Sequence, residues 1–292
     1  MALKVLDAER DTLNMDVSRL EEALTEKTRM VVGVSILGNP ANLDAMRTFA
    51  DTHDLYFFED NCESLDAVLP GGKMTGTYGD MSTFSFFFSH HISTMEGGMI
   101  VTDDQELYEL CKCLRSHGWA RDLPKDSVLF ESNPNDAFEA YRFLMPGYNV
   151  RPIEMSAAIG LEQLKKLPAM TVQRRKNWAL FQELFGNDER FIIQKEHGQS
   201  SSFCFTLMMS PDLKTDRTKL FDAMRDADIG FRIITGGCFT RHDQAALYNH
   251  STVGDLANAN MAHDRGFFVG NHPFDLTEQI TRLREVLDKA CG

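Results

Sequence analysis

Residues 30–60 read MVVGVSILGNPANLDAMRTFADTHDLYFFED, and this stretch decides the fold class. Met30 to Leu37 is a continuous apolar run with β-branched residues, which predicts a buried strand. Ala41 to His53 carries apolar residues at helical spacing, and Leu55 to Phe58 predicts a second strand that runs to Asp60. A strand, a helix and a strand in this order are typical of an α/β sheet that helices cover on both faces.

The same alternation continues to the end of the chain. Strands are predicted at 82–88, 98–102, 202–209, 229–234 and 267–269, and helices at 105–116, 153–167, 168–185, 215–228 and 277–290. The pattern predicts a large α/β domain with a mostly parallel sheet over residues 1–168. A bridging helix and a smaller α+β domain are expected over residues 169–292.

Composition excludes several classes of function. The chain has 292 residues with 43% hydrophobic content, enough for a sizeable core, and a net charge of −13 that argues against nucleic acid as a partner. No apolar run reaches the roughly 18 residues that span a membrane. The six cysteines are scattered, which predicts reduced thiols in a cytoplasmic protein.

The candidate site follows two of the predicted strands. Asp60 stands at the carboxyl end of one strand, where α/β sheets bind their ligands. Residues 83–98 read TFSFFFSHHISTMEGG, so Ser85 is followed by His90 five residues later and then by a Gly-Gly turn. An imidazole titrates near ~6.5 and can both accept and donate a proton near neutral pH. Asp60 could instead cap a turn, and Ser85 could be an ordinary strand serine.

These residues belong to stretches that resemble the sugar aminotransferase family, which builds amino- and deoxysugars on the fold of aspartate aminotransferase. The matching stretches are 58–63, 84–85, 96–98, 147–152 and 155–158. The resemblance implies a pyridoxal-phosphate-dependent transferase of fold type I. His90 stands where the family has its cofactor-binding lysine, and this exchange is similar to the branch of sugar 3-dehydratases. Residues 236–242 and 267–273 resemble members that act on GDP-4-keto-6-deoxymannose.

The resemblance implies a reaction. Pyridoxamine phosphate would serve in the removal of the C3 hydroxyl from an NDP-4-keto-6-deoxyhexose, with GDP-4-keto-6-deoxymannose preferred. The product would be a 4-keto-3,6-dideoxy sugar for lipopolysaccharide O-antigen. Glutamate would return pyridoxal phosphate to its amine form. Without a lysine at position 90, the cofactor would be held non-covalently, and homodimers with shared active sites are expected.

The resemblance also implies a role for individual residues. Asp60 would hold the protonated pyridine nitrogen, and Ser85 would bind the cofactor phosphate. His90 would take a proton from the cofactor's C4′ carbon and protonate the departing C3 hydroxyl. Asn149 would reach the phosphate of the partner subunit's cofactor, unless it is only a turn residue. Glu63 would lie beside the ring.

The sequence offers four cationic candidates for anion binding and two cysteines to consider as metal ligands. His117, Arg121, Arg241 and His242 are candidates for a diphosphate or a carboxylate, although an arginine on an acidic protein is often a solvated ion-pair partner. One branch member uses an iron–sulfur cluster, but residues 118–125, which match its motif, contain no cysteine. Cys111 and Cys113 are two apart on a predicted helix and point in different directions. We therefore expect no metal and no iron–sulfur cluster.

Two alternatives remain open. Family members carry a longer N-terminal segment, which includes a phosphate-binding turn, so this chain is interpreted as shortened at its N-terminus. It could then be a catalytically silent relative with a dimerisation or regulatory role. It could also be an ordinary aminotransferase whose lysine lies elsewhere, but Lys73 is the nearest upstream lysine and its position does not fit.

Overall fold

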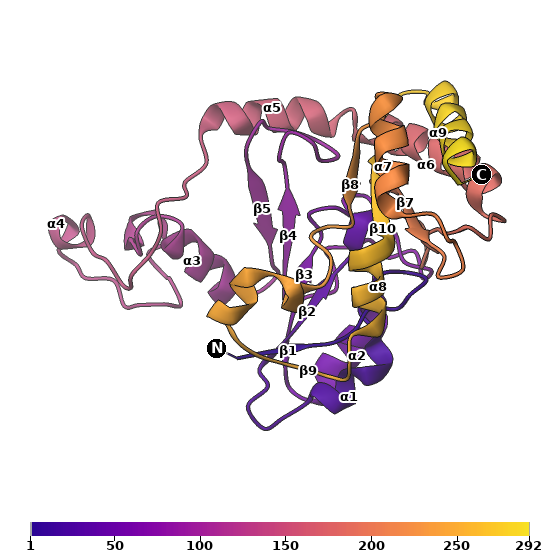
Figure 1. The fold of residues 1–292 in the computed structure, drawn as a ribbon. Coiled ribbons are helices and arrows are strands. Elements are labelled where there is room, and N and C mark those ends of the chain that lie inside the picture. The colour runs from indigo at the N-terminus through magenta and orange to yellow at the C-terminus, as the bar shows by residue number, and fades with distance from the viewer. Residues whose placement is uncertain (1, 292) are drawn as a thin grey trace.

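The computed structural model describes residues 2–291, which form two four-stranded sheets and one two-stranded sheet (Figure 1). The first sheet has the strand order β2-β3-β4-β5. Its strands are β2 (Met30–Val34), β3 (Tyr56–Asp60), β4 (Met81–Ser85) and β5 (Gly98–Val101). The first three are parallel and β5 is antiparallel to β4. The mostly parallel sheet is thus confirmed, and the carboxyl ends of β2, β3 and β4 meet at one edge.

Helix α2 (Leu43–Thr52) covers one face of this sheet. The side chain of Asn42 accepts a hydrogen bond from the Ala45 N–H at 3.2 Å and so begins the helix. Met46 is fully buried on the sheet side of α2. Gly33 of β2 lets the helix come close, since a Cβ there would lie 2.7 Å from the Met46 sulfur.

The opposite face of the first sheet is open, so the prediction that helices cover both faces is wrong for the described residues. Met30, Val32 and Val34 alternate with buried neighbours along β2 and are 47%, 39% and 42% exposed. Tyr56 and Ile100 on the neighbouring strands are 60% and 51% exposed. An unbroken apolar run predicts burial on both sides, but local composition does not show whether a second layer covers it.

The strand boundaries at the site also differ from the prediction. β2 ends at Val34 instead of Leu37, because the chain turns into a 3-10 helix, η2 (Ile36–Gly38), in which Leu37 has a positive φ of 58°. β4 ends at Ser85 instead of Phe88, because the chain leaves the strand for a compact loop. These early ends bring the candidate residues onto loops at the edge of the sheet.

The second sheet is antiparallel, with the order β6-β7-β10-β8. Its strands are β6 (Phe191–Ile192), β7 (Cys204–Met209), β10 (Gly266–Gly270) and β8 (Phe231–Ile233). All six residues of β7 are buried. Three helices pack around this sheet: α6 (Leu167–Phe185), α7 (Arg217–Asp226) and α9 (Thr277–Cys291). Apart from β6, which was not predicted, these elements agree with the predicted ones to within a few residues.

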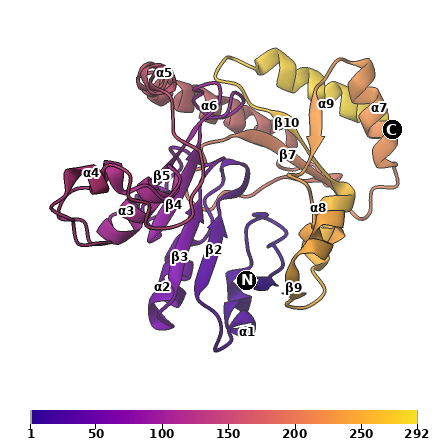
Figure 2. The same ribbon diagram turned by 90° about the vertical axis from the view of Figure 1, so that its left-hand side faces the viewer.

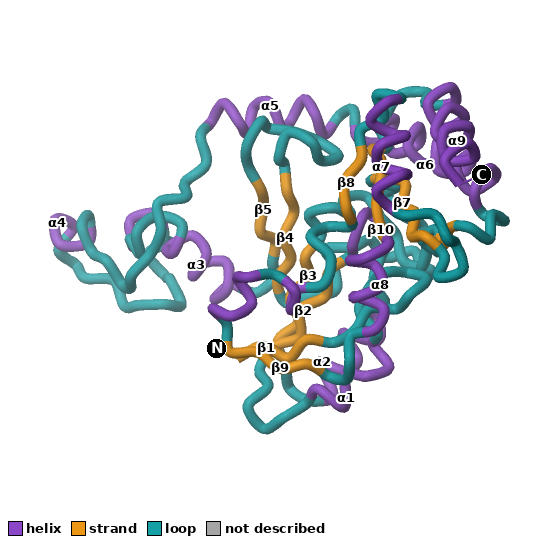
Figure 3. Tube along the Cα trace, in the orientation of Figure 1, coloured by secondary structure: helices purple, strands orange, loops and turns teal. Residues whose placement is uncertain are grey.

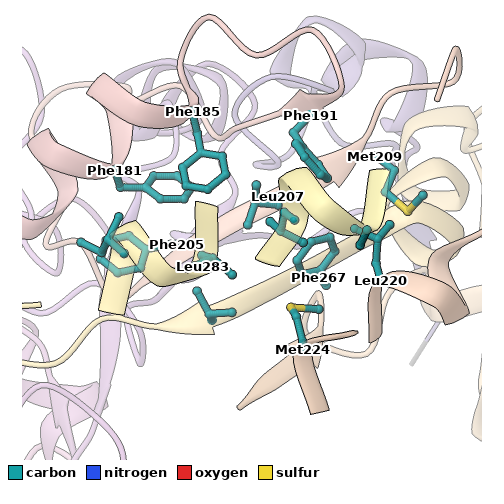
Figure 4. Close-up of a cluster of buried hydrophobic side chains, with 14 of the residues drawn as sticks. Phe181, Phe185, Phe191, Phe205, Leu207, Met209, Leu220, Met224, Phe267 and Leu283 are labelled. Carbon is teal, nitrogen blue, oxygen red and sulfur yellow. The ribbon is translucent and has the colours of Figure 1, made fainter. Parts of the chain in front are cut away.

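A cluster of aromatic and aliphatic side chains forms the core between these helices and the second sheet (Figure 4). Phe181 of α6 stacks on Phe205 of β7 with ring centroids 4.9 Å apart, and Phe185 lies 4.8 Å from Phe181. Both rings of α6 are fully buried, and Leu283 of α9 closes the cluster. Burying a large apolar side chain stabilises a fold by about 1.5–3 kcal/mol, so α6 is tied firmly to the second sheet.

Several elements carry no clear signal in the sequence. Strand β1 (Ala2–Val5) pairs in parallel with β9 (Asn249–Thr252), which joins the N-terminal segment to the second half of the chain. Helix α8 (Ala257–Arg265) is capped from a distance, because the Asp7 carboxylate accepts the N–H groups of Asn258 and Ala259 at 2.9 and 2.8 Å. The remaining short elements are η1 (Val17–Arg19), α1 (Leu20–Ala23), η4 (Phe239–Arg241) and η5 (Asp243–Leu247).

An arm extends from the first sheet, away from both cores (Figure 1), and consists mostly of loop (Figure 3). After α3 (Gln105–Leu114) it contains η3 (Ala120–Asp122) and α4 (Asp136–Glu139), and it returns along α5 (Glu154–Leu164). No residue of α5 is buried. From α5 the chain continues into α6 and so crosses to the second sheet (Figure 2).

The described residues offer neither a membrane span nor a metal centre. None of their helices combines the length and the apolar character that crossing a bilayer requires. Within residues 2–291, no three histidine, cysteine or acidic side chains come together as ligands for a metal ion. Cys113 is buried in α3 and Cys111 is half-buried, so the two thiols have different surroundings.

Candidate active site

The candidate residues converge at the carboxyl edge of the first sheet. Asp60 is the last residue of β3 and pairs with Thr83 of β4, and Ser85 ends β4 two residues later. Side chains two apart on a strand share a face, so Asp60, Thr83 and Ser85 lie on the open face of the sheet. The edge thus presents a carboxylate and two hydroxyls, next to the loop that carries His90.

The Asp60 carboxylate has one oxygen engaged and one available. Its Oδ1 accepts a hydrogen bond from the Cys62 N–H at 3.1 Å, which fixes the side chain at the end of β3. Its Oδ2 accepts no N–H or O–H hydrogen bond from the other described residues, and the side chain is half-buried. Burial, followed by a hydrogen bond with the Asp60 carboxylate and by its charge, raises the pKa of the Cys62 thiol to about 12. The Cys62 thiol therefore stays protonated at neutral pH.

His90 is oriented by the same residue that holds Asp60. Its Nδ1 lies 2.6 Å from the carbonyl oxygen of Cys62. A carbonyl can only accept, so Nδ1 carries the proton of the neutral ring and Nε2 keeps its lone pair. Cys62 thus donates its backbone N–H to Asp60 and accepts a hydrogen bond from His90 at its carbonyl oxygen. A base whose second nitrogen is fixed in this way is ready to take a proton at Nε2.

Two phenyl rings border the His90 imidazole. Phe87 meets it edge-on at a centroid distance of 5.9 Å, and Phe203, from the loop before β7, meets it at 5.3 Å. The His90 backbone N–H donates to the Phe87 carbonyl at 3.0 Å, which closes a turn. The ring is therefore held from the loop of the first sheet and from the second half of the chain.

Ser85 and Glu63 have partners of their own. The Ser85 hydroxyl oxygen accepts the Phe87 N–H at 3.2 Å, which leaves its proton available to a ligand. The Glu63 carboxylate accepts the Leu37 N–H at 2.7 Å and so supports the 3-10 turn after β2. Burial raises the pKa of Glu63, the Leu37 hydrogen bond opposes the rise, and the nearby Asp60 charge adds to it. The contact of Glu63 with the cofactor ring stays a prediction.

Glu59, next to Asp60, anchors this edge of the sheet from the covered face. It is fully buried, and its two oxygens accept the N–H groups of Gly76, Tyr78 and Gly79 at 2.7, 2.6 and 2.5 Å. The Ser82 hydroxyl donates to it at 3.1 Å. This carboxylate fixes the loop before β4 and, with it, the ends of β3 and β4.

The two adjacent histidines differ sharply. His91 is buried, and its Nε2 donates to the Ser201 carbonyl at 3.3 Å. Burial, followed by the nearby Arg174 charge, lowers the pKa of His91 to about 3. His91 is therefore a neutral structural residue at neutral pH, whereas His90 is half-buried at the open edge. The five-residue spacing from Ser85 selected the histidine that lies there.

Other predicted residues lie on the arm, outside this group. Ser116 pairs with Asn149, and the His117 N–H donates to the Tyr148 carbonyl at 2.7 Å, so Asn149 and His117 are neighbours. Arg121 lies over the Trp119 ring at 5.0 Å. Asn149, His117 and Arg121 are all exposed, and Figure 1 shows the part of the arm between α3 and α5 directed away from the first sheet.

The remaining predicted residues belong to the second half of the chain. Arg241 forms an ion pair with Asp264 at 2.6 Å, and His242 Nε2 contacts the Gly236 carbonyl. Both are thus engaged within their own region. Lys73, the lysine of the aminotransferase alternative, places its ammonium 4.1 Å from the centroid of the Tyr78 ring in its own loop.

Three residues around the site were not predicted: Cys62, Glu59 and Phe203. Cys62 acts through backbone atoms, which no side-chain pattern reveals. Glu59 precedes Asp60 in the strand, and an acidic residue inside an apolar strand was a usable signal for a buried carboxylate with partners. Phe203 is more than 100 residues from His90, and no local pattern connects them.

The arrangement fits a pyridine ring with a phosphate. A free carboxylate oxygen at a strand end suits a protonated ring nitrogen, and Ser85 on the same face can donate to a phosphate oxygen. His90 Nε2 offers a proton acceptor from the next loop. The edge can thus bind an aromatic cofactor and move one proton beside it.

Comparisons with known proteins agree with this arrangement. The model of the DegT/DnrJ/EryC1/StrS aminotransferase family matches residues 3–288. GDP-4-keto-6-deoxy-D-mannose 3-dehydratase of Yersinia pseudotuberculosis is 44% identical over 289 residues, which are 98% of this chain and 73% of that protein. The enzyme of the same name from Escherichia coli O55:H7 is 42% identical, with coverages of 98% and 74%.

Solved structures give the same result. The E. coli GDP-4-keto-6-deoxy-D-mannose 3-dehydratase with bound hydrated PLP has a TM-score of 0.93 and 43% identity, and the match covers 97% of this chain and 73% of that one. Two further structures of that enzyme have the same TM-score at 42% identity, each covering 97% of this chain and 74% of the other. One holds GDP-perosamine and the other a trapped PLP–glutamate geminal diamine.

Proposed function

We propose that this chain, which belongs to the DegT/DnrJ/EryC1/StrS aminotransferase family, is a pyridoxamine-phosphate-dependent sugar 3-dehydratase. The observation that carries the proposal is His90, whose Nδ1 is held by the Cys62 carbonyl at 2.6 Å while Nε2 is left as a base. A lysine at this position could hold the cofactor covalently, but an imidazole can only move a proton. The chain is related to PLP-dependent sugar 3-dehydratases, which supports this reading.

The proposed reaction removes the C3 hydroxyl of an NDP-4-keto-6-deoxyhexose and gives a 4-keto-3,6-dideoxy sugar. GDP-4-keto-6-deoxymannose is the substrate we favour, because similar enzymes carry it in their names and one similar structure holds GDP-perosamine. Glutamate is the favoured amino donor, because another similar structure holds a PLP–glutamate adduct. Arg121 and His117, or Arg241 and His242, would bind the diphosphate or the glutamate carboxylate.

The residues of the chain divide the chemical work. The bound cofactor supplies a ring that accepts the electron pair of a broken C–H bond. Asp60 would keep the ring nitrogen protonated through its free Oδ2, and Ser85 would bind the phosphate. His90 Nε2 would accept the proton from the cofactor's C4′ carbon. The same proton would then pass to the C3 hydroxyl, which leaves as water when the C3–O bond breaks.

A cytoplasmic homodimer completes the proposal. The eleven residues of α5 include no buried one, and Met155 and Leu161 are 69% and 65% exposed. Tyr141 and Tyr148 on the arm are 76% and 69% exposed. Apolar surface on this scale is typical of an interface between subunits. In such a dimer, Asn149 would reach the partner's cofactor phosphate. Leu161→Glu should therefore shift the sedimentation coefficient to that of a monomer, whereas Gln163→Glu, two residues further along α5 and so on a different side of the helix, should not.

The function is tested by incubating the chain with pyridoxamine phosphate, glutamate and GDP-4-keto-6-deoxymannose. Mass spectrometry should show a nucleotide sugar that has lost its C3 oxygen, and 2-oxoglutarate should accumulate. An isothermal titration with pyridoxamine phosphate separates the alternatives. Tight binding without a product would contradict the substrate assignment. No binding would favour a catalytically silent relative.

A further inference from the structure

The segment Ser200–Phe203 belongs to the second half of the chain but contacts two loops of the first half. One is the turn after β2, and the other is the loop between β4 and β5, residues 86–97, which carries His90 and is called the catalytic loop below. The Ser201 N–H donates to the Gly38 carbonyl at 3.0 Å, and the Ser200 hydroxyl donates to the same oxygen at 2.8 Å. Gly38 has a φ of +92°, and a Cβ there would lie 2.7 Å from the Phe203 nitrogen. The backbone of the segment thus packs directly against the backbone of the turn after β2, with no room for a side chain at Gly38.

Three successive carbonyls of this segment are each bound by a different buried side chain. His91 donates to Ser201 at 3.3 Å, Asn271 donates to Ser202 at 2.8 Å, and Arg174 donates to Phe203 at 3.3 Å. These donors come from the loop after β4, the loop after β10 and helix α6. Their exposed fractions are 3%, 2% and 4%.

The backbone of the segment is held in a conformation that it would not adopt alone. Ser202 has a positive φ of 53°, which is uncommon outside glycine and is kept only where the surroundings determine it. The Ser202 N–H also donates to the Ser200 hydroxyl at 2.8 Å. The segment is therefore a rigid support, and the side chain that it presents to the catalytic loop is Phe203.

The Phe203 ring lies against both histidines of that loop. It meets the His90 ring at 5.3 Å with an angle of 61° between the planes, and the His91 ring at 5.4 Å with an angle of 42°. Aromatic pairs in this range of distances and angles are favourable beyond the area they bury. Rotation of the His90 ring away from the Cys62 carbonyl would break this contact.

We propose that Phe203 is a positioning residue for His90, holding the imidazole with Nδ1 on the Cys62 carbonyl and Nε2 free. This proposal rests on the proposed function for its catalytic consequence, but the orientation and tautomer of His90 are properties of the chain alone. Without the ring, His90 can rotate and exchange tautomers. A misplacement of about 1 Å can reduce a rate roughly 100-fold.

The first test is nuclear magnetic resonance of protein labelled with ¹⁵N in its histidines, with His90 assigned by its absence in His90→Asn. We expect His90 to hold its proton at Nδ1 in the wild type and in Phe203→Tyr, which keeps the ring. In Phe203→Leu, its two nitrogen shifts should converge towards tautomer-averaged values. His91 serves as an internal reference, since the Ser201 carbonyl holds its proton at Nε2.

The second test is kinetic. With the keto sugar as substrate, Phe203→Leu should lower kcat roughly 10- to 100-fold with little change in KM, and Phe203→Tyr should restore most of it. Phe231→Leu, which removes a partly buried ring from β8, controls for general loss of packing and should leave kcat unchanged. An unchanged His90 tautomer in Phe203→Leu would overturn the proposal. If the His90 tautomer changes in Phe203→Leu but neither the wild type nor any variant dehydrates the sugar, the proposed function fails and the positioning role stands.

Discussion

Glu59→Gln is the substitution with the most specific expected cost. One Glu59 oxygen accepts from Tyr78, Gly79 and Ser82, and the other accepts from the Gly76 N–H and, at 3.3 Å, from the Asn61 side-chain amide. A glutamine can keep the first set with its amide oxygen, but its NH2 group then faces the Gly76 N–H. That buried donor is left without an acceptor, which costs about 1–3 kcal/mol.

The remaining hydrogen bonds also weaken, because the acceptor is no longer charged. Hydrogen bonds to charged groups contribute about 1.5–3 kcal/mol and neutral ones about 0.5–1.5 kcal/mol. With roughly 1 kcal/mol lost at each of two backbone partners, the free energy of unfolding should fall by about 3–5 kcal/mol in total. Since Glu59 also fixes the strand that ends in Asp60, affinity for pyridoxamine phosphate should fall as well.

A matched control is available in Glu109, another buried glutamate whose carboxylate has several partners. It accepts from Ser127 and Gln105, each at 2.5 Å, and from the Val128 N–H at 3.0 Å, far from Asp60 in the arm. Urea denaturation should show a comparable loss of stability in Glu109→Gln, but titration should show unchanged cofactor affinity. A loss below about 1 kcal/mol in Glu59→Gln would refute the reasoning, as would equal weakening of cofactor binding in both variants.

Three further predictions concern the same edge of the sheet. Buried His91 has a pKa of about 3, below the value near ~6.5 in the unfolded chain. The contribution of neutral His91 to the free energy of unfolding is therefore complete above pH 6.5 and is lost as pH falls towards 3. Between pH 6.5 and 5 the free energy of unfolding should fall by roughly 2 kcal/mol because of His91. His91→Gln should remove this pH dependence, whereas the control His197→Gln should keep it. Gly38→Ala should destabilise the fold by about 1–3 kcal/mol, because the residue has a φ of +92° and the Cβ would strike the Phe203 nitrogen; a thermal melt identical to wild type would contradict this. His90→Lys should make the cofactor linkage covalent and reducible by borohydride and should end dehydration; a variant that still dehydrates the sugar at the wild-type rate would disprove the role of His90.

The parts of the fold with clear periodicity could be predicted from the sequence. Helices α2 and α9 follow from local spacing, because their apolar residues repeat with the helical period. Strands β7, β8 and β10 follow from short apolar runs, whereas β6 was not predicted. The open face of β2 could not be predicted, because an apolar strand does not reveal which layers cover it. The β1–β9 pair depends on contact between opposite ends of the chain.

The candidate site was predictable where its residues stand at fixed spacing along the sequence. Asp60, Ser85 and His90 sit at fixed spacing around strand ends, and the structure brings them to one edge. The group that orients His90 is a backbone carbonyl, and its aromatic support comes from a distant segment. Neither leaves a local pattern. The candidates for substrate contacts were chosen by charge alone, and the structure divides them between the arm and the second half of the chain.

The central claim, that His90 is the base of a pyridoxamine-phosphate-dependent dehydration, is tested most directly by one rapid-mixing measurement. The chain loaded with pyridoxamine phosphate is mixed with GDP-4-keto-6-deoxymannose, and absorbance follows the conversion of the cofactor from its amine to its aldehyde form in wild type and His90→Asn. The account predicts a rate lower by roughly 10²–10⁴ in the variant, with cofactor affinity unchanged. Equal rates in the two proteins would contradict it.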